Sequence, residues 1–243
     1  MTGTKRTAAQ VIVDVIQQEG VEYIFGLPGG AAIPIFDALV DSPIKLVLTR
    51  HEQGATHMAD GYARATGKPA VVLVTSGPGA TNTITGILTA MMDSIPMVII
   101  CGQTTTGNLG LDAFQEADVS GISYPVVKHS YLIKDANDVP RIMREAFYVS
   151  QTGRPGPVLV DVPKDVSSAL IEPDFTEEFH LPGYSVPGPG DQDSIEQAAM
   201  LLQNARKPVI LAGHGAIISG AEKAIRHLAE RMQIPVTNTL LGK

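Results

Sequence analysis

The segment RHEQGATHMADGYARATG, residues 50–67, places two histidines and a glutamate where an apolar run ends. A helical zinc site needs two histidines four residues apart on one face. His51 and His57 are six apart, so a helix turns them away from each other, and we expect no metal site here. Glu52 follows the apolar run IKLVLT, and in open α/β sheets ligands bind beyond the carboxyl ends of the strands. Glu52 is therefore either an ordinary surface glutamate or a carboxylate that acts on a bound ligand.

Two glycine-rich turns also follow apolar runs. GLPGG spans residues 26–30, and TSGPGATN spans residues 75–82. Neither is the G-x-G-x-x-G signature of dinucleotide binding. Each is either a tight turn that needs unusual backbone angles or a loop whose backbone contacts a bound ring or anion at a helix start. A third such turn, AGHGAIISG, follows later at residues 212–220.

Apolar runs and helical patterns alternate along the chain. The runs are continuous rather than alternating with polar residues, as expected for parallel strands covered on both faces. This order predicts an α/β fold with a doubly wound parallel sheet. Residues 103–131 are polar and glycine-rich, which predicts a long loop with short helical turns. The expected strands are 23–26, 44–49, 70–76, 96–102 and 157–162, and the expected helices are 8–19, 31–41, 51–66, 83–92 and 137–150.

Thr7 is a good helix N-cap, and Gly20 is a good stop for the first helix. In the helix after Glu52, alanines recur every four residues at positions 55, 59 and 63. Small side chains in such a row let another element approach closely. The other element can belong to the same domain or to a second copy of the chain. We expect this alanine face to pack against a second copy or, in a monomer, to form an exposed apolar patch.

The pattern divides the chain into three parts. Residues 1–166 form the first domain, and residues 167–190, rich in proline and glycine, form a linker. Residues 191–243 read as the start of a second α/β domain, with expected helices at 193–205 and 221–232 and strands at 208–213 and 234–238. Two strands do not bury a core of their own, so we expect this domain to be incomplete.

Composition excludes several classes of protein. The net charge is −7, from 18 basic and 25 acidic residues, which argues against a nucleic-acid partner. The single cysteine excludes an intrachain disulfide and favours a reducing compartment. The N-terminus lacks the apolar core of a secretory signal, and no apolar run is long enough to cross a membrane. These features predict a soluble, cytoplasmic protein without a membrane partner.

Six stretches occur together in one order and resemble the N-terminal part of thiamine-diphosphate enzymes, most closely the acetolactate synthases. HEQGA and TSGPGATN alone indicate only the superfamily, whereas DAFQEAD and RPGPVLVDVPKDV narrow the match. The stretches are GLPGGAAIPIFDAL, RHEQGATHMADGYARATGKP, VVLVTSGPGATN, DSIPMVIICGQ, DAFQEADVSGIS and GRPGPVLVDVPKDV.

The resemblance implies roles for particular residues. The first domain would bind the aminopyrimidine ring of the cofactor, and Glu52 would hydrogen-bond a ring nitrogen and so activate the cofactor. Gln115 would be the second catalytic residue. The positions implied for cofactor binding are Gly29, Gly30, Ser76, Gly77, Pro78 and Asn82, with Arg154 for the flavin, and those implied for the 2-ketoacid substrate are Ala31, Phe114 and Lys164.

The same resemblance implies the wider activity. The enzyme would decarboxylate pyruvate and join it to a second 2-ketoacid, giving acetolactate for branched-chain amino acid biosynthesis. It would use thiamine diphosphate, Mg²⁺ and FAD, with the Mg²⁺ ligands outside this chain, which alone is expected to be inactive. His214 stands where the family has a small residue in the flavin-binding region.

Assembly and alternatives also follow from the resemblance. It implies a homodimer or tetramer with the active site at the subunit interface, and a small regulatory subunit as a further partner. The alternatives are a related thiamine-diphosphate decarboxylase or oxidase, or a truncated, non-catalytic pairing module.

Overall fold

A computed structural model describes residues 4–243, and the chain divides into two compact units between Val186 and Pro187. The first unit contains a six-stranded sheet with the order β3-β2-β4-β5-β7-β6, and every neighbouring pair is parallel. The predicted α/β fold with a parallel sheet is thus confirmed. The strands are β2 (Tyr23–Gly26), β3 (Lys45–Leu48), β4 (Ala70–Val74), β5 (Met97–Gln103), β6 (His129–Leu132) and β7 (Pro157–Pro163).

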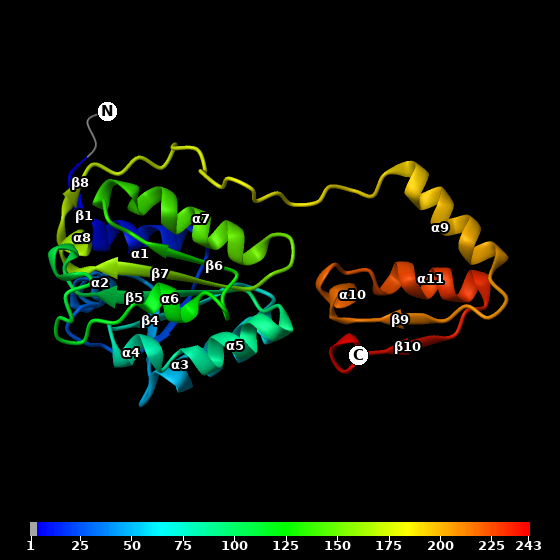
Figure 1. Cartoon of the computed structure of the whole chain (residues 1–243), viewed down its shortest axis with the longest axis horizontal. Helices are drawn as coiled ribbons and strands as arrows, with labels where there is room; N and C mark the ends of the chain where they lie inside the picture. Colours follow the sequence, from blue (N-terminus) through cyan, green and yellow to red (C-terminus); the bar gives the residue numbers. More distant parts are fainter. Residues whose placement is uncertain (1–3) are drawn as a thin grey trace. The chain divides into compact units, whose positions relative to one another are not determined.

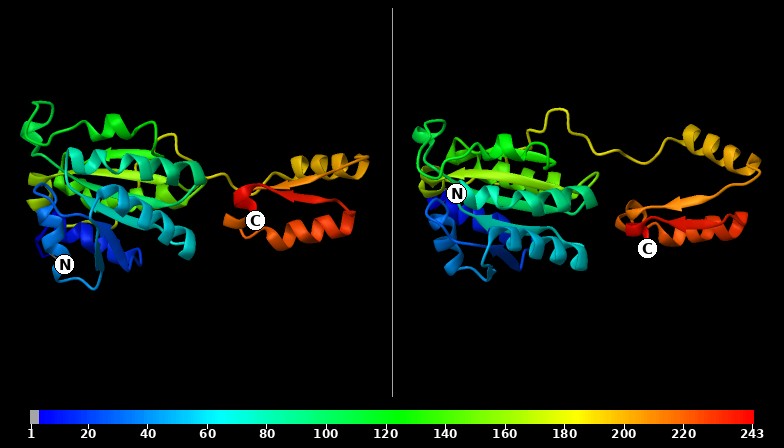
Figure 2. Two further views of the ribbon diagram at one scale, coloured as in Figure 1. Left: turned by 90° about the horizontal axis from the view of Figure 1, so that it is seen from below. Right: turned by 60° about the horizontal axis from the view of Figure 1, so that its bottom comes forward.

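Helices cover both faces of this sheet (Figure 1). One core contains side chains of α1 (Ala8–Gln18), α2 (Ile33–Val40) and α7 (Val139–Gln151). The other contains side chains of α3 (Glu52–Thr66) and α5 (Ile84–Asp93). Figure 2 shows the same sheet and helices from two other directions.

Strand β4 shows why the apolar runs do not alternate with polar residues. All five of its residues are buried. Val71 and Leu73 belong to one core, while Ala70, Val72 and Val74 belong to the other. A strand with two buried faces has no position left for an exposed polar side chain.

Helix α1 begins after Thr7 and ends before Gly20, as the sequence predicts. The Thr7 hydroxyl accepts a hydrogen bond from the Gln10 amide at 3.2 Å, and the Gln10 side chain accepts one from the Thr7 amide at 3.0 Å. This reciprocal pair satisfies two amides that would otherwise have no partner at the helix start. The chain leaves the helix through Gly20, whose φ of +73° is easily reached only without a side chain.

The expectation for the alanine face of α3 is wrong. Ala55, Ala59 and Ala63 are buried inside the unit, in the core that α3 shares with α5 and the sheet. Their small size lets α3 lie close to its neighbours within one copy of the chain. Gly86 of α5 completes the fit, because a Cβ there would overlap the hydroxyl of Thr56.

The region from 103 to 131 contains more regular structure than the sequence predicts. It holds the 3₁₀ turn η1 (Thr106–Asn108) and helix α6 (Val119–Ser123), both compatible with the expected short turns. It also leads into β6, an edge strand paired with β7, which the sequence analysis missed. The remaining short elements of the first unit are β1 (Arg6–Thr7), α4 (Pro78–Thr81), η2 (Ala136–Asp138), α8 (Lys164–Ser168) and β8 (Leu170–Ile171).

Part of the expected linker packs on the first unit. Strand β8 pairs antiparallel with β1. Further along, Glu145 accepts a hydrogen bond from the His180 amide at 2.6 Å, and Lys128 donates one to the Tyr184 hydroxyl at 3.1 Å. Leu181 and Tyr184 also pack against the core beneath them. The first unit therefore extends well beyond its last sheet strand.

The second unit has one two-stranded parallel sheet, formed by β9 (Ile210–Ala212) and β10 (Val236–Asn238). Helix α10 (His214–Ile218) occupies the place of the expected third glycine turn. No helix within residues 4–243 is long and apolar enough to cross a membrane. The other elements are α9 (Gln192–Asn204), α11 (Glu222–Met232) and η3 (Leu240–Gly242).

Candidate active site

Several loops meet at one edge of the large sheet. Because its strands are parallel, the segments that follow β2, β3, β4, β5 and β7 all leave from the carboxyl edge. Glu52 lies at this edge as the first residue of α3 and is only 8% exposed. His51 caps the same helix, its Nδ1 accepting a hydrogen bond from the Gln53 amide at 3.1 Å. The start of a helix stabilises a carboxylate through the helix dipole.

The carboxylate of Glu52 is fixed by a residue of the second glycine turn. Its Oε2 accepts a hydrogen bond from Asn82 Nδ2 at 2.9 Å. Its other oxygen, Oε1, lies beside Gly79, where a Cβ would be 3.4 Å away. Glycine at position 79 keeps this side of the carboxylate free of a side chain. Ser76, which begins the same turn, is 3% exposed.

The two glycine turns pack against each other through Thr75, a residue that the sequence analysis did not single out. A Cβ on Gly29 would lie 2.5 Å from Thr75 Cγ2, so only glycine fits there. The Thr75 hydroxyl accepts a hydrogen bond from the Ala31 amide at 3.3 Å. Gly30, between Gly29 and Ala31 in the sequence, has open space where a Cβ would lie. The signal for Thr75 was its position at the end of an apolar strand.

Gln115 reaches this edge from the loop that follows β5. Gly77 has a φ of +54°, and a Cβ there would lie 2.5 Å from the carbonyl oxygen of Gln115. Gln115 itself has a φ of +56°, a backbone conformation that residues other than glycine rarely adopt. Phe114, its neighbour, is 88% exposed. Lys164 follows β7 at the same edge, as the first residue of α8.

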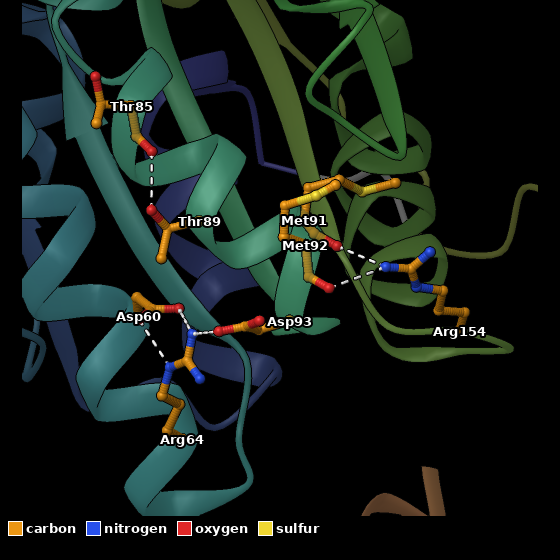
Figure 3. Close-up of polar contacts among 8 residues, drawn as sticks. All are labelled: Asp60, Arg64, Thr85, Thr89, Met91, Met92, Asp93 and Arg154. Atoms are coloured by element: carbon orange, nitrogen blue, oxygen red, sulfur yellow. Dashed lines mark hydrogen bonds and ion pairs between the residues drawn. The ribbon is translucent and has the colours of Figure 1, made fainter. Parts of the chain in front are cut away.

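Arg154 lies at the opposite edge, just before β7 begins. Its guanidinium donates hydrogen bonds to the carbonyls of Met91 and Met92, at 2.9 and 3.2 Å (Figure 3), and to Ser94 Oγ at 2.8 Å. These groups belong to the end of α5. Arg154 therefore caps that helix, and it does not join the group around Glu52.

Two buried polar residues near the edge escaped the sequence analysis. Gln103 is 1% exposed and Asp161 is 2% exposed, on the neighbouring strands β5 and β7. Burial raises the pKa of Asp161 to about 7, the hydrogen bond from Gln103 opposes that rise, and the charge of Asp118 adds to it. The available signal was a polar residue directly after one apolar run, Gln103, and a polar residue inside another, Asp161.

The chemistry of the site follows from these contacts. One carboxylate oxygen is held by an amide, the other lies beside a glycine, and the backbone of two glycine turns lies nearby. Such a site suits a flat ring whose nitrogen shares a proton with a carboxyl group. At Gly29 and Gly79 a Cβ would overlap Thr75, so the missing side chains let the two turns pack closely beside this carboxylate. The aminopyrimidine ring of thiamine diphosphate fits this description.

Comparison with known protein families gives two matches. Residues 6–122 match the family model described as thiamine pyrophosphate enzyme, N-terminal TPP binding domain. Residues 195–243 match the central domain of the thiamine pyrophosphate enzymes. The first match includes Glu52, both glycine turns and Gln115.

Curated relatives are similar over nearly the whole chain. An acetolactate synthase of Arthrospira platensis is 49% identical over 98% of this chain and 42% of its own length. The acetolactate synthase large subunit of Haemophilus influenzae has the same identity and the same coverage of both chains. The isozyme 3 large subunit of Escherichia coli is 47% identical over 97% of this chain and 42% of its own. The chain thus spans about two fifths of the length of these relatives.

Proposed function

Because the chain belongs to the thiamine pyrophosphate enzymes, we propose that its first unit binds the aminopyrimidine ring of thiamine diphosphate and that Glu52 activates the cofactor. The observation that carries this proposal is the hydrogen bond from Asn82 to Glu52. It fixes one carboxylate oxygen and leaves the other for a ring nitrogen. Gly29, Gly30, Ser76, Gly77 and Pro78 line the ring in this proposal.

When bound, thiamine diphosphate supplies a carbon nucleophile for a ketone and accepts the electrons released by decarboxylation. Glu52 shares a proton with the ring nitrogen, and its burial keeps water from competing for that proton. Asn82 keeps the carboxylate in one orientation. Glu52 begins α3, a helix that packs on the sheet, and this packing supports the geometry needed for proton transfer.

We infer that the reaction is the decarboxylation of pyruvate and its joining to a second 2-ketoacid, giving acetolactate for branched-chain amino acid synthesis. The names of the three relatives support this assignment. Gln115 acts as the second catalytic residue, Ala31 and Phe114 contact the substrate, and the Lys164 ammonium meets its carboxylate.

This chain forms the N-terminal part of a longer enzyme in our proposal. The ligands for Mg²⁺, and with them the main binding site for the diphosphate, lie outside residues 1–243. FAD is a further cofactor in this proposal, and Arg154 of the first unit contacts it. The guanidinium of Arg154 would then both cap α5 and meet the flavin.

Assembly is proposed from the surface of α3 and α5. Met58, Leu88 and Met92 are 50%, 42% and 64% exposed on these two helices. Apolar side chains gathered on neighbouring helices favour association of two copies into a homodimer, or of two dimers into a tetramer. Two of the relatives are named as large subunits, which supports a small regulatory subunit as a further partner. The buried Cys101 fits the reducing environment of the cytoplasm.

Product formation from pyruvate tests the function. The full-length enzyme, with thiamine diphosphate, Mg²⁺ and FAD supplied, is expected to form acetolactate, whereas the 243-residue chain is expected to form none. Calorimetry should find weak binding of thiamine diphosphate to the short chain, since Mg²⁺ and backbone donors hold most of a diphosphate. Acetaldehyde or acetate as the main product of the full-length enzyme would instead identify a related decarboxylase or oxidase.

A further inference from the structure

We propose that Gln103 and Asp161 form a buried latch that positions the loop of residues 104–118, and with it Gln115, over the candidate active site. Its consequence for catalysis rests on the proposed function, because that function gives Gln115 its role. Gln103 and Asp161 are positioning residues in this proposal. They act through the loop and do not touch the substrate.

The side-chain amide of Gln103 joins three segments of the chain. Its Nε2 donates to the carbonyl of Ala117 at 3.0 Å and to Asp161 Oδ2 at 2.9 Å. Its Oε1 accepts from the amide of Thr104 at 2.8 Å. One buried side chain therefore ties the first residue of the loop, a residue near its end, and strand β7. A buried amide with all these partners satisfied has one favourable orientation.

The loop has little else to hold it in place. None of residues 104–118 is buried. Of its three large apolar side chains, Leu111 and Phe114 are 68% and 88% exposed, and Leu109 is half-buried. Hydrophobic packing therefore contributes little to its position, and polar contacts decide it. The other anchor at its start is Asp165, which accepts hydrogen bonds from the amide and hydroxyl of Thr106 at 3.0 and 2.5 Å.

The latch lies next to the residues assigned to the site. Gly102 precedes Gln103, and a Cβ on Gly102 would lie 2.6 Å from the amide nitrogen of Ala32. Beyond the latch, the Gln115 carbonyl lies against Gly77. Gln103 thus lies between the first glycine turn, residues 26–30, and the loop of residues 104–118. That loop contacts the second glycine turn at Gly77. A shift of its side chain would move Gln115 relative to both turns.

Asp161 suits the latch because its surroundings favour a neutral carboxyl group. Its Oδ1 is buried without a hydrogen-bond partner, while its Oδ2 accepts from Gln103. Burial raises its pKa to about 7, and the carboxylate of Asp118 adds to that rise. The thiol of Cys101, opposite Asp161 on β5, also has a pKa raised by burial. Asparagine can accept the same hydrogen bond from Gln103.

Hydrogen exchange on the 243-residue chain tests the latch without any assay of activity. In Gln103→Met the side chain keeps its bulk but loses both donors, and amides of residues 106–116 should exchange at least about tenfold faster. Asp161→Asn should keep wild-type exchange in the same loop. Ser150→Ala is the matched control: it removes a buried hydroxyl bonded to Phe147 on α7, far from the loop in sequence and contacts.

Kinetics of the full-length enzyme test the consequence for catalysis. Gln103→Met should lower kcat/KM for pyruvate roughly 10- to 100-fold through misplacement of Gln115, while Asp161→Asn keeps the wild-type value. Affinity for thiamine diphosphate should change less than about threefold, since neither residue touches Glu52 or Asn82. A general loss of structure would instead weaken the cofactor and the substrate together.

Each result decides a separate point. Unchanged loop exchange in Gln103→Met, or exchange that rises equally in β4 and β5, would overturn the latch. Faster loop exchange with unchanged kcat/KM would overturn its positioning role. A wild-type enzyme that forms no acetolactate would contradict the proposed function instead, and the exchange comparison would still decide the latch.

Discussion

Asn82 donates a hydrogen bond to Glu52 across 30 residues of sequence, with 2.9 Å between Nδ2 and Oε2. The two residues follow different strands, and the parallel sheet brings them together at its carboxyl edge. This contact converts a flexible glutamate into a carboxylate with one fixed and one open oxygen. The strength of this hydrogen bond and the role of the Glu52 charge can both be tested.

Glu52→Gln in the full-length enzyme should lower the rate of acetolactate formation by roughly two to four orders of magnitude. The amide keeps the shape of the carboxylate and can still accept from Asn82, but it cannot share a proton with the ring. Cofactor affinity, measured by calorimetry, should therefore fall much less than the rate. Glu178→Gln, at an exposed position, is the control and should retain full activity. Full activity in Glu52→Gln would remove the role assigned to this residue.

Asn82→Asp should destabilise the chain near neutral pH. The substitution places a second carboxylate beside Glu52, and two such groups in one site raise the pKa of one of them. The repulsion is relieved when that group takes up a proton, so the loss of stability should shrink as the pH falls from 7 to 5. Urea unfolding at the two pH values measures this, with Asn82→Ala as the uncharged control. An equal loss for both variants at both pH values would show that the carboxylates do not interact.

Gly77→Ala should displace the loop that carries Gln115. The alanine Cβ would lie 2.5 Å from the Gln115 carbonyl oxygen, and the φ of +54° would add strain. Gly110→Ala separates these effects, because Gly110 also has a positive φ, of +77°, but open space around it. We expect a loss of roughly 1 kcal/mol in the free energy of unfolding for Gly110→Ala and more for Gly77→Ala. Only Gly77→Ala should also lower kcat/KM in the full-length enzyme.

Asp161→Asn should change how stability depends on pH. The folded pKa of about 7 lies above the value near 4 of an unfolded aspartate, so the folded chain keeps this proton longer. The free energy of unfolding should therefore fall as the pH rises from about 4 to about 7, by on the order of 1 kcal/mol per pH unit from this group. Urea unfolding between pH 4 and pH 8 should show a flatter profile for Asp161→Asn. Asp37→Asn, an exposed position on α2, should keep the wild-type slope.

Arg154→Met should lower the free energy of unfolding by roughly 1–2 kcal/mol even without flavin, because the carbonyls at the end of α5 lose their donor. Arg206→Met, at an exposed position, is the control. Thermal or urea unfolding of the flavin-free chain measures both. Unchanged stability in Arg154→Met would mean that the capping contacts contribute nothing, which would leave flavin binding as the residue's remaining role.

The sequence predicted the central sheet because β4, β5 and β7 are continuous apolar runs between helical patterns. It missed β6, whose four residues HSYL form an edge strand with little apolar signal. It placed Glu52 near the turn of residues 76–82 through the geometry of parallel strands. It could not predict that Ala55, Ala59 and Ala63 face inward, because a row of small residues suits a contact within one copy or between two.

The latch escaped prediction for a different reason. Asp161 interrupts an apolar strand and Gln103 ends another, but their partnership depends on the pairing of β5 with β7. No local pattern specifies that two strands so distant in sequence become neighbours. Contacts within one turn or helix could be predicted, whereas contacts between strands required the topology.

The pairing of β5 with β7 also determines when this part of the sheet can form while the chain is being synthesised. Asp161 follows Gln103 by 58 residues, so the loop after β5 leaves the ribosome well before its partner strand exists. Domains begin to fold while the chain is still being made, and pairings between distant segments form slowly. The sheet edge that carries Glu52 is therefore completed late, after α7 and β7 have docked. Until β7 pairs with it, one edge of β5 lacks its partner strand, and such an unpaired edge can pair with another chain.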